Sequence, residues 1–301
     1  MSSAENFPHS VNCFLTDRSN KKMAFQFAVS VSHNDMEKEL WANRMAESGI
    51  TAFEYSCGGF PEIRDLRNKI SFLTPYLQEG KFSFPSVHLP AWFTSETPGQ
   101  ANDFEREMCI KRLANFIETA APLGMKNLTL HSGIVPEGQT REEAVAAVRD
   151  TLKRLAVTAE KYGMSLNLEL CPIRSVSNHP DALEQIMEDM PDCVGVCFDV
   201  NHAGVYWEEV PQWIARAGKY IRTFHISDCD EFGECHWMPG TGVLDWEAIM
   251  REIRKLNKDF LFVYEIVYGG FAPPAQKREM DPKFFFKAVK ANMEWLNTLG
   301  Q

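Results

Sequence analysis

Imidazole and carboxylate side chains recur at one kind of position in this sequence, the end of a short apolar segment. Histidines hold that position, or lie within two residues beyond it, at His33, His88, His131, His202 and His225. Carboxylates hold it at Glu54, Glu169, Asp199 and Glu265. A charge or an imidazole inside an apolar strand is costly to bury without a partner. Because the pattern repeats in every segment, it predicts a functional cluster rather than unrelated strand ends.

A cluster of carboxylates and imidazoles is electrostatically unfavourable unless a cation neutralises it. Three carboxylates with one imidazole suit a divalent ion such as Mn, Mg, Co or Zn and leave coordination positions open for a substrate. We therefore predict that one divalent metal ion is held by four ligands: Glu169, Asp199, His225 and Glu265.

The segments that carry these residues are predicted to be strands. They are short and rich in apolar, β-branched and aromatic residues, and they cover residues 25–31, 50–56, 84–89, 127–132, 165–170, 194–200, 221–227 and 260–267. Helical patterns separate them. Thr140 and Glu143 form a capping box, Asp103 opens another helix, and Asp281 is expected to cap a last helix with Pro282 at its first position.

Strands that alternate with helices, several of them apolar on both faces, favour a parallel sheet. An open nucleotide-binding sheet lacks support, because Gly240-Thr-Gly242 has no third glycine and no G-x-G-x-x-G follows a strand. We predict an α/β fold, a single (β/α)8 TIM barrel over residues 24–301, preceded by a short N-terminal arm over residues 1–23. The strand ends then meet at one rim, where the active sites of such barrels lie. The four ligand strands are neighbours on one arc of that rim.

The composition restricts the partners. The 301 residues carry 31 Lys and Arg against 41 Asp and Glu, a net charge of −10, and no basic block, so we expect no nucleic acid partner. No uncharged apolar stretch reaches the length of about 18 residues that a membrane span needs. The eight cysteines form no Cys-x-x-Cys pair, which favours free thiols and a cytoplasmic protein. A homo-oligomer stays possible.

Several segments resemble the xylose-isomerase-like TIM barrel superfamily, which includes sugar isomerases and epimerases, inosose isomerases and dehydratases, and endonuclease IV. The resemblance covers about residues 25 to 298 and rests on residues 168–170, 198–202, 224–228, 264–265 and 236–246. The stretch from His225 to Trp246 is most similar to inosose isomerases and to uncharacterised sugar isomerase/epimerase proteins.

The resemblance implies a metal-dependent isomerase or epimerase of a sugar or cyclitol. In such enzymes the four ligands bind one divalent ion, and two glutamates, here Glu169 and Glu265, exchange the proton next to a carbonyl through a metal-bound enediolate. It also implies that the substrate contacts a set of rim residues: His88, His131, His202, His236 and Trp237. Asp228, three residues beyond His225, is expected to orient its neighbours.

Two alternatives remain open. A dehydratase or lyase acting on a keto-sugar, inosose or 3-keto-glycoside would use the same proton abstraction and then expel a leaving group. An endonuclease IV-like nuclease would use three zinc ions, and the resemblance leaves a second metal open at His88 and His131. Its Asp-Arg-His segment is Glu234-Cys235-His236 here, which lacks the arginine, and the net charge of −10 disfavours DNA.

Overall fold

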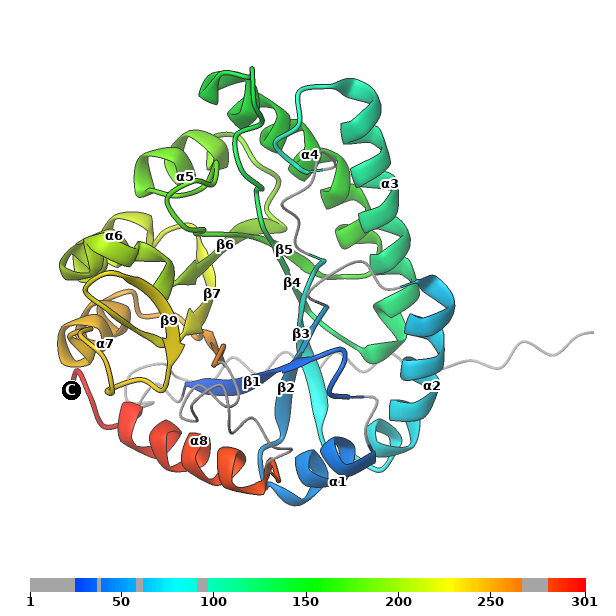
Figure 1. Ribbon diagram of the computed structural model, residues 1–301, viewed down its shortest axis with the longest axis vertical. Coiled ribbons are helices and arrows are strands. Elements are labelled where there is room, and N and C mark those ends of the chain that lie inside the picture. Colours follow the sequence, from blue (N-terminus) through cyan, green and yellow to red (C-terminus); the bar gives the residue numbers. More distant parts are fainter. Residues whose placement is uncertain (1–24, 37–38, 58–61, 91–96, 267–280) are drawn as a thin grey trace, which may run out of the picture.

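A computed structural model describes residues 25–36, 39–57, 62–90, 97–266 and 281–301, and the predicted arm at 1–23 lies outside this part of the chain. Parallel strands close into a barrel surrounded by helices (Figure 1). The barrel strands, in their spatial order, are β1 (Gln26–Ser32), β10 (Leu261–Tyr264), β7 (Ile221–Ile226), β6 (Val194–Asp199), β5 (Ser165–Glu169), β4 (Asn127–Leu130), β3 (Ser83–His88) and β2 (Ala52–Ser56). The predicted (β/α)8 barrel is confirmed.

Helices follow the barrel strands and pack on the outside of the barrel (Figure 1). They are α1 (Glu39–Glu47), α2 (Ile63–Gln78), α3 (Asp103–Ala120), α4 (Arg141–Lys161), α5 (Pro180–Met187), α6 (Val210–Ala217), α7 (Trp246–Lys255) and α8 (Lys283–Leu296). Short 3-10 turns lie at η1 (Ala121–Leu123) and η2 (Asn201–Glu209). Within the described residues, no helix combines the length and the apolar character that crossing a membrane requires.

Two predicted helix starts are confirmed, and a third is wrong by one residue. Thr140 and Glu143 form the predicted capping box of α4. Helix α3 begins at Asp103 as predicted, and Asn102 before it is the N-cap, because its side chain accepts hydrogen bonds from two backbone N–H groups of the first turn. Pro282, not Asp281, is the N-cap residue of α8. Asp281 still accepts a bond from the first N–H of that helix.

A short hairpin after β7 was not predicted. It consists of β8 (Asp228–Asp230) and β9 (Gly233–Trp237), which pair antiparallel outside the barrel. Strand β9 packs against η2, and the Cys235 N–H donates to Asn201 Oδ1 at 3.3 Å. The hairpin thus returns the chain to the rim between the ends of β6 and β7, and it carries Glu234 and His236 there.

The alternation of side chains along each strand separates two environments. On β7, Phe224 stacks on Phe262 of β10 with ring centroids 5.1 Å apart, as part of the large core beneath the helices. The next residue, His225, is fully buried and belongs to the inner face. The inside of the barrel holds a small apolar cluster of Ala28, Leu261 and Val263. It also holds the fully buried polar side chains of Glu54, Ser86, Thr129, Asn167 and Thr223.

Candidate metal centre and active site

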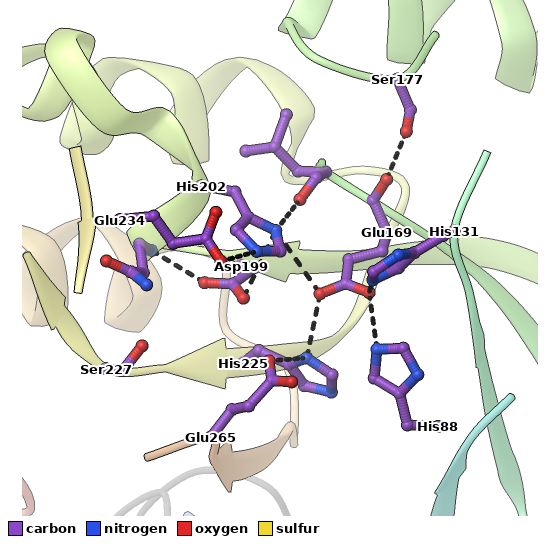
Figure 2. Close-up of polar contacts among 12 residues, drawn as sticks. His88, His131, Glu169, Ser177, Asp199, His202, His225, Ser227, Glu234 and Glu265 are labelled. Carbon is purple, nitrogen blue, oxygen red and sulfur yellow. Dashed lines mark hydrogen bonds and ion pairs between the residues drawn. The ribbon is translucent and has the colours of Figure 1, made fainter. Parts of the chain in front are cut away.

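The strand register brings the four predicted metal ligands together. Asp199 of β6 lies directly opposite His225 of β7, Glu169 ends β5, and Glu265 follows β10. One ligand atom from each of the four residues lies within 4.8 Å of the others. All four side chains come from neighbouring strand ends and point toward one another (Figure 2). The C-terminal ends of all the barrel strands lie at this rim, where the active sites of such barrels are found.

Glu169 lies at the centre of this cluster (Figure 2). Its Oε1 is 3.1 Å from His225 Nδ1, and its Oε2 is 2.7 Å from His131 Nε2 and 3.1 Å from His88 Nε2. The backbone is fixed as well, because Ser177 Oγ donates to the Glu169 carbonyl at 2.6 Å. Contacts to the backbone carbonyl and to both carboxylate oxygens therefore hold Glu169 in place before any ligand binds.

The facing imidazoles decide the charge state of Glu169. Burial by itself raises the pKa of this carboxyl, but the charges of His131, His225 and His88 outweigh it and hold the pKa well below the usual range. Asp199 shows the opposite balance, because burial, with Glu265 and Glu169 nearby, raises its pKa to about 7. Two carboxyl groups of one cluster thus differ strongly in proton affinity, which is typical of functional sites.

Glu265 is the ligand that reaches furthest toward the mouth of the barrel. Its side chain is 24% exposed, whereas those of Glu169 and Asp199 are fully buried. Its Oε2 is 2.9 Å from His225 Nδ1. Burial raises the pKa of the Glu265 carboxyl, but the positive charge of His225 outweighs that effect and the pKa falls below its usual range. Glu265 is therefore a carboxylate that a substrate can approach.

The donor atoms fit a metal ion. Within the described residues, Glu169 Oε2, Asp199 Oδ2 and Glu265 Oε2 are buried and form no hydrogen bond, although buried carboxylate oxygens normally do. Each of them lies instead at ion-pair distance from an imidazole nitrogen, at 2.7, 3.5 and 2.9 Å, respectively. Carboxylate oxygens with one imidazole nitrogen form the hard-to-borderline donor set of a divalent ion. The donor set and the buried carboxylate charge of the site therefore both suit a bound cation, and this conclusion rests on the residues of this chain alone.

The orientation of three histidines adds to this argument. Nδ1 of His88, His202 and His236 faces a backbone carbonyl at 2.9, 2.8 and 3.0 Å, respectively. A carbonyl only accepts, so each Nδ1 carries the proton and each Nε2 points toward a carboxylate. Such an imidazole is either doubly protonated or binds a cation through Nε2. In the protonated case the carboxylates offset the effect of burial, which lowers the pKa, and raise the pKa of His88 and His236 to about 9.

Further groups of potential metal donors adjoin the four-ligand set. The ligand atoms within each group lie within 4.8 Å of one another: His88, Glu169 and His225; His131, Glu169 and Cys171; and His202, Glu234 and His236. Glu234 Oε1 links the last group, at 2.7 Å from His236 Nε2 and 3.6 Å from His202 Nε2. The rim thus offers more donors than a single ion uses.

The predicted substrate-contacting residues differ in accessibility. The side chains of His131 and His236 are 19% and 16% exposed, so they can face a substrate in the mouth of the barrel. Those of His88 and His202 are only 5% and 4% exposed and lie against the carboxylates. Trp237 is half-buried on β9, opposite Asp228 in the hairpin. The role of all five in substrate binding stays a prediction.

Two residues were noted in the sequence, but their contacts in the site were not predicted. Glu54 was noted as a strand-end carboxylate, but its contact with His225, at 3.2 Å from Nε2, crosses the barrel and has no local signal. Glu234 reaches the site only because the unpredicted hairpin returns the chain to the rim. The charged residue inside the apolar segment ITAFEYS was the one available hint for Glu54.

Asp228 organises the loop that follows the hairpin. Its Oδ1 accepts from the N–H groups of Cys229 and Leu244 at 3.0 and 3.2 Å, and its Oδ2 accepts from Gly240 N–H and Trp246 Nε1 at 2.8 and 2.9 Å. The side chain is fully buried. Both carboxylate oxygens therefore accept hydrogen bonds. In an asparagine variant the amide NH2 would take the place of one oxygen and would face N–H donors from which it cannot accept.

We expect Asp228→Asn to lower the free energy of unfolding by about 2–4 kcal/mol, because two buried donors lose their acceptor. Urea denaturation measures this change. Asp230→Asn is the matched control, because Asp230 uses a single oxygen, Oδ1, for the N–H groups of Phe232 and Gly233. An amide oxygen can replace it. Equal stability of the two variants would contradict this interpretation of Asp228.

Comparison with known proteins adds sequence relatives. The uncharacterized protein y4fM of Sinorhizobium fredii is 25% identical over 233 residues, which cover 74% of this chain and 68% of that protein. The inosose isomerase of Bacillus subtilis is 25% identical over 156 residues, which cover 49% of this chain and 56% of that enzyme. The match thus spans about half the length of the inosose isomerase.

Solved structures share the fold. A D-tagatose 3-epimerase-like protein superposes with a TM-score of 0.71 at 22% identity, over 91% of this chain and 98% of that one. The IOLI protein, solved with a bound zinc atom, superposes with a TM-score of 0.70 at 17% identity over the same shares. The sequence model of the xylose isomerase-like TIM barrel matches residues 42–292, most of the chain. This chain therefore belongs to the xylose isomerase-like TIM barrel family.

Proposed function

We propose that this protein is a divalent-metal-dependent isomerase or epimerase of a sugar or cyclitol. The observation that carries the proposal is the convergence of Glu169, Asp199, His225 and Glu265, whose ligand atoms lie within 4.8 Å of one another at the rim of the barrel. An Mn, Mg, Co or Zn ion held there would stabilise the negative charge that develops on a carbonyl oxygen when the neighbouring C–H is deprotonated.

Glu265 and Glu169 are the residues that would move the proton. Both carboxyls have lowered pKa values and are ionised at neutral pH, as a base must be. Glu265 is the more accessible of the two and can take the proton from one face of a substrate carbon. Glu169 approaches the same atom, His225 Nδ1, at 3.1 Å, so both carboxylates adjoin one position in the site. His131 and His236, which are partly exposed, would position substrate hydroxyls.

The relatives support a carbohydrate or cyclitol substrate. The inosose isomerases act on a cyclic polyol with a carbonyl group, and the names of the structural neighbours include a 3-keto-D-glucoside 4-epimerase and an L-ribulose 3-epimerase. Each of these names describes a change next to a carbonyl, which is the chemistry that a carboxylate pair beside a metal site can perform.

A metal-dependent hydrolase is the second candidate, and the additional donor groups favour it. His88 and His131 approach Glu169 from one side, and His202, Glu234 and His236 form a group of their own. Ions held in neighbouring groups could activate water for hydrolysis of a phosphate ester. The net charge of −10 argues against DNA as its substrate.

Solvent exchange tests the proposal. The protein is loaded with Mn, Co, Mg or Zn and incubated in D2O with a panel of keto-sugars and inososes, and deuterium at the carbon next to the carbonyl is detected by NMR. We expect incorporation together with conversion to an isomer of equal mass apart from the deuterium. Loss of water or of an aglycone would indicate the lyase instead. No exchange on any compound, together with incision of abasic DNA, would overturn the proposal in favour of the hydrolase.

A further inference from the structure

Glu54 is a carboxylate inside the barrel that the proposed chemistry does not use. It lies on β2, across the barrel from β5 and β6, which carry Glu169 and Asp199, and its side chain is fully buried. Ser86 Oγ of the neighbouring strand donates to its Oε2 at 2.7 Å. The same oxygen lies 3.2 Å from Nε2 of His225. A buried carboxylate is costly, so this contact requires a reason.

The two ring nitrogens of His225 face different groups. Nδ1 faces the ligand cluster, at 3.1 Å from Glu169 Oε1 and 2.9 Å from Glu265 Oε2. Nε2 faces away from it, toward Glu54. A neutral imidazole has one protonated and one unprotonated nitrogen. If Nδ1 is to offer its lone pair to a metal ion, the proton must lie on Nε2, where a buried N–H needs an acceptor. Glu54 Oε2 lies in the position to accept it.

Three other rim histidines show the reverse arrangement. His88, His202 and His236 each direct Nδ1 at a backbone carbonyl and turn Nε2 toward a carboxylate. His225 is turned the other way and has a carboxylate as its outer partner. A carboxylate that accepts from a metal-bound imidazole fixes the tautomer and the ring orientation, and makes the ring more basic.

We propose that Glu54 is a positioning residue that accepts the Nε2–H of His225 and thereby holds Nδ1 toward the metal site. The inference rests on the metal site proposed above and deepens it. Glu54 contributes no ligand and touches no substrate; it acts through His225. Ser86 in turn fixes Glu54 Oε2, so the chain Ser86–Glu54–His225 runs from β3 to β7 across the interior of the barrel.

Metal affinity, measured without any substrate, tests the role of Glu54. Wild type, Glu54→Ala, Glu54→Gln and Ser86→Ala are stripped with a chelator and titrated with Co2+, whose visible absorption bands report the ligand geometry. We expect Glu54→Ala to weaken Co2+ binding by about 10–100-fold and to change the bands. Glu54→Gln should lose less, because its amide oxygen can still accept from Nε2. Ser86→Ala keeps the Glu54 carboxylate but removes the donor that fixes its Oε2, so it should weaken Co2+ binding less than Glu54→Ala does. Thr129→Val, treated in the same way, is the control and should bind like wild type, because the buried Thr129 Oγ1 has no hydrogen-bond partner among the described residues.

Melting temperatures of the stripped proteins separate a loss of metal affinity from a loss of stability. Equal Co2+ affinity and equal bands in wild type and Glu54→Ala would overturn the role of Glu54 while leaving the metal site intact. Absence of Co2+ binding in wild type would overturn the metal site itself. If Glu54→Ala does not fold, the 15N spectrum of metal-loaded wild type decides. A proton on Nε2 of His225 agrees with the proposal, and a proton on Nδ1 contradicts it.

Discussion

Glu265→Gln is expected to slow deuterium exchange at the carbon next to the substrate carbonyl by about 1,000-fold or more. General base catalysis by a placed carboxylate contributes roughly 100- to 10,000-fold, and a neutral amide cannot accept the proton. The amide oxygen of Gln can still face His225 Nδ1 and the ligand cluster, so the substitution changes the geometry little. The assay is NMR detection of exchange in D2O with the substrate found in the panel.

The metal content of the same preparation separates the two possible causes. If Glu265→Gln retains its metal and loses exchange, the carboxylate acts as the base; if it loses the metal as well, Glu265 acts at least in part as a ligand. Glu231→Gln is the matched control, because Glu231 is exposed at the hairpin turn and the substitution removes the same charge. Turnover by Glu265→Gln at the wild-type rate would contradict the assignment.

Removing the metal with a chelator is expected to abolish exchange and to lower the melting temperature by on the order of 10 °C. A ligand present at about a thousand times its dissociation constant stabilises the folded state by about 4 kcal/mol. The melting temperature of a chain of this size changes by a few degrees for each kcal/mol of stability. The physical reason is that Glu169, Asp199 and Glu265 bring together buried carboxylate oxygens that form no hydrogen bond among the described residues, and a cation would balance their charge. Differential scanning calorimetry with and without chelator measures the shift.

The stripped protein should also become less stable as the pH rises. The carboxylates raise the pKa of His88 and His236 to about 9 in the folded state, against about 6.5 in an unfolded chain. A raised pKa stabilises the fold below about pH 6.5, and this stabilisation is lost as the pH increases toward 9. Zinc competes with protons for the same cluster, so the metal-bound protein should gain stability relative to the stripped one over this range.

Urea denaturation at pH 6.5 and 9, with and without zinc, distinguishes these trends. If the imidazoles only fill space, the stability of the stripped protein and that of the zinc-bound protein should depend on pH in the same way.

In the chelation experiment, recovery of deuterium exchange after metal is added back shows that the chelator did not simply unfold the protein. Full exchange activity in the presence of excess chelator, with no metal bound, would contradict the proposed mechanism.

The strands and helices of the barrel could be predicted because each carries a strong local signal. Segments such as VGVCFDV are apolar on both faces, and a capping box at Thr140 marks the start of α4. Element ends were less certain. His131 and Glu265 were placed inside strands but lie one residue beyond β4 and β10, because barrel pairing stops there. The N-cap of α8 is Pro282 and not the predicted Asp281, although Asp281 still accepts from the first N–H of that helix.

The four-ligand cluster followed from topology, since parallel strands of a barrel end on one rim. The remaining contacts depend on positions that no local pattern specifies. Glu54 meets His225 across the barrel, 171 residues away in sequence. Glu234 reaches His202 and His236 through a hairpin whose short strands, DCD and GECHW, lack the apolar alternation that marks a strand. Contacts of this kind come from tertiary packing and could not be predicted from the sequence alone.

The number of metal ions per chain tests the central claim most directly. Plasma mass spectrometry on protein purified without chelator counts Mn, Co, Mg and Zn in one measurement. The account predicts about one ion per chain, bound by Glu169, Asp199, His225 and Glu265. Two or three zinc ions would move the interpretation to hydrolytic chemistry at the additional donor groups. No metal, even after it is added back, would contradict the account and leave only the barrel.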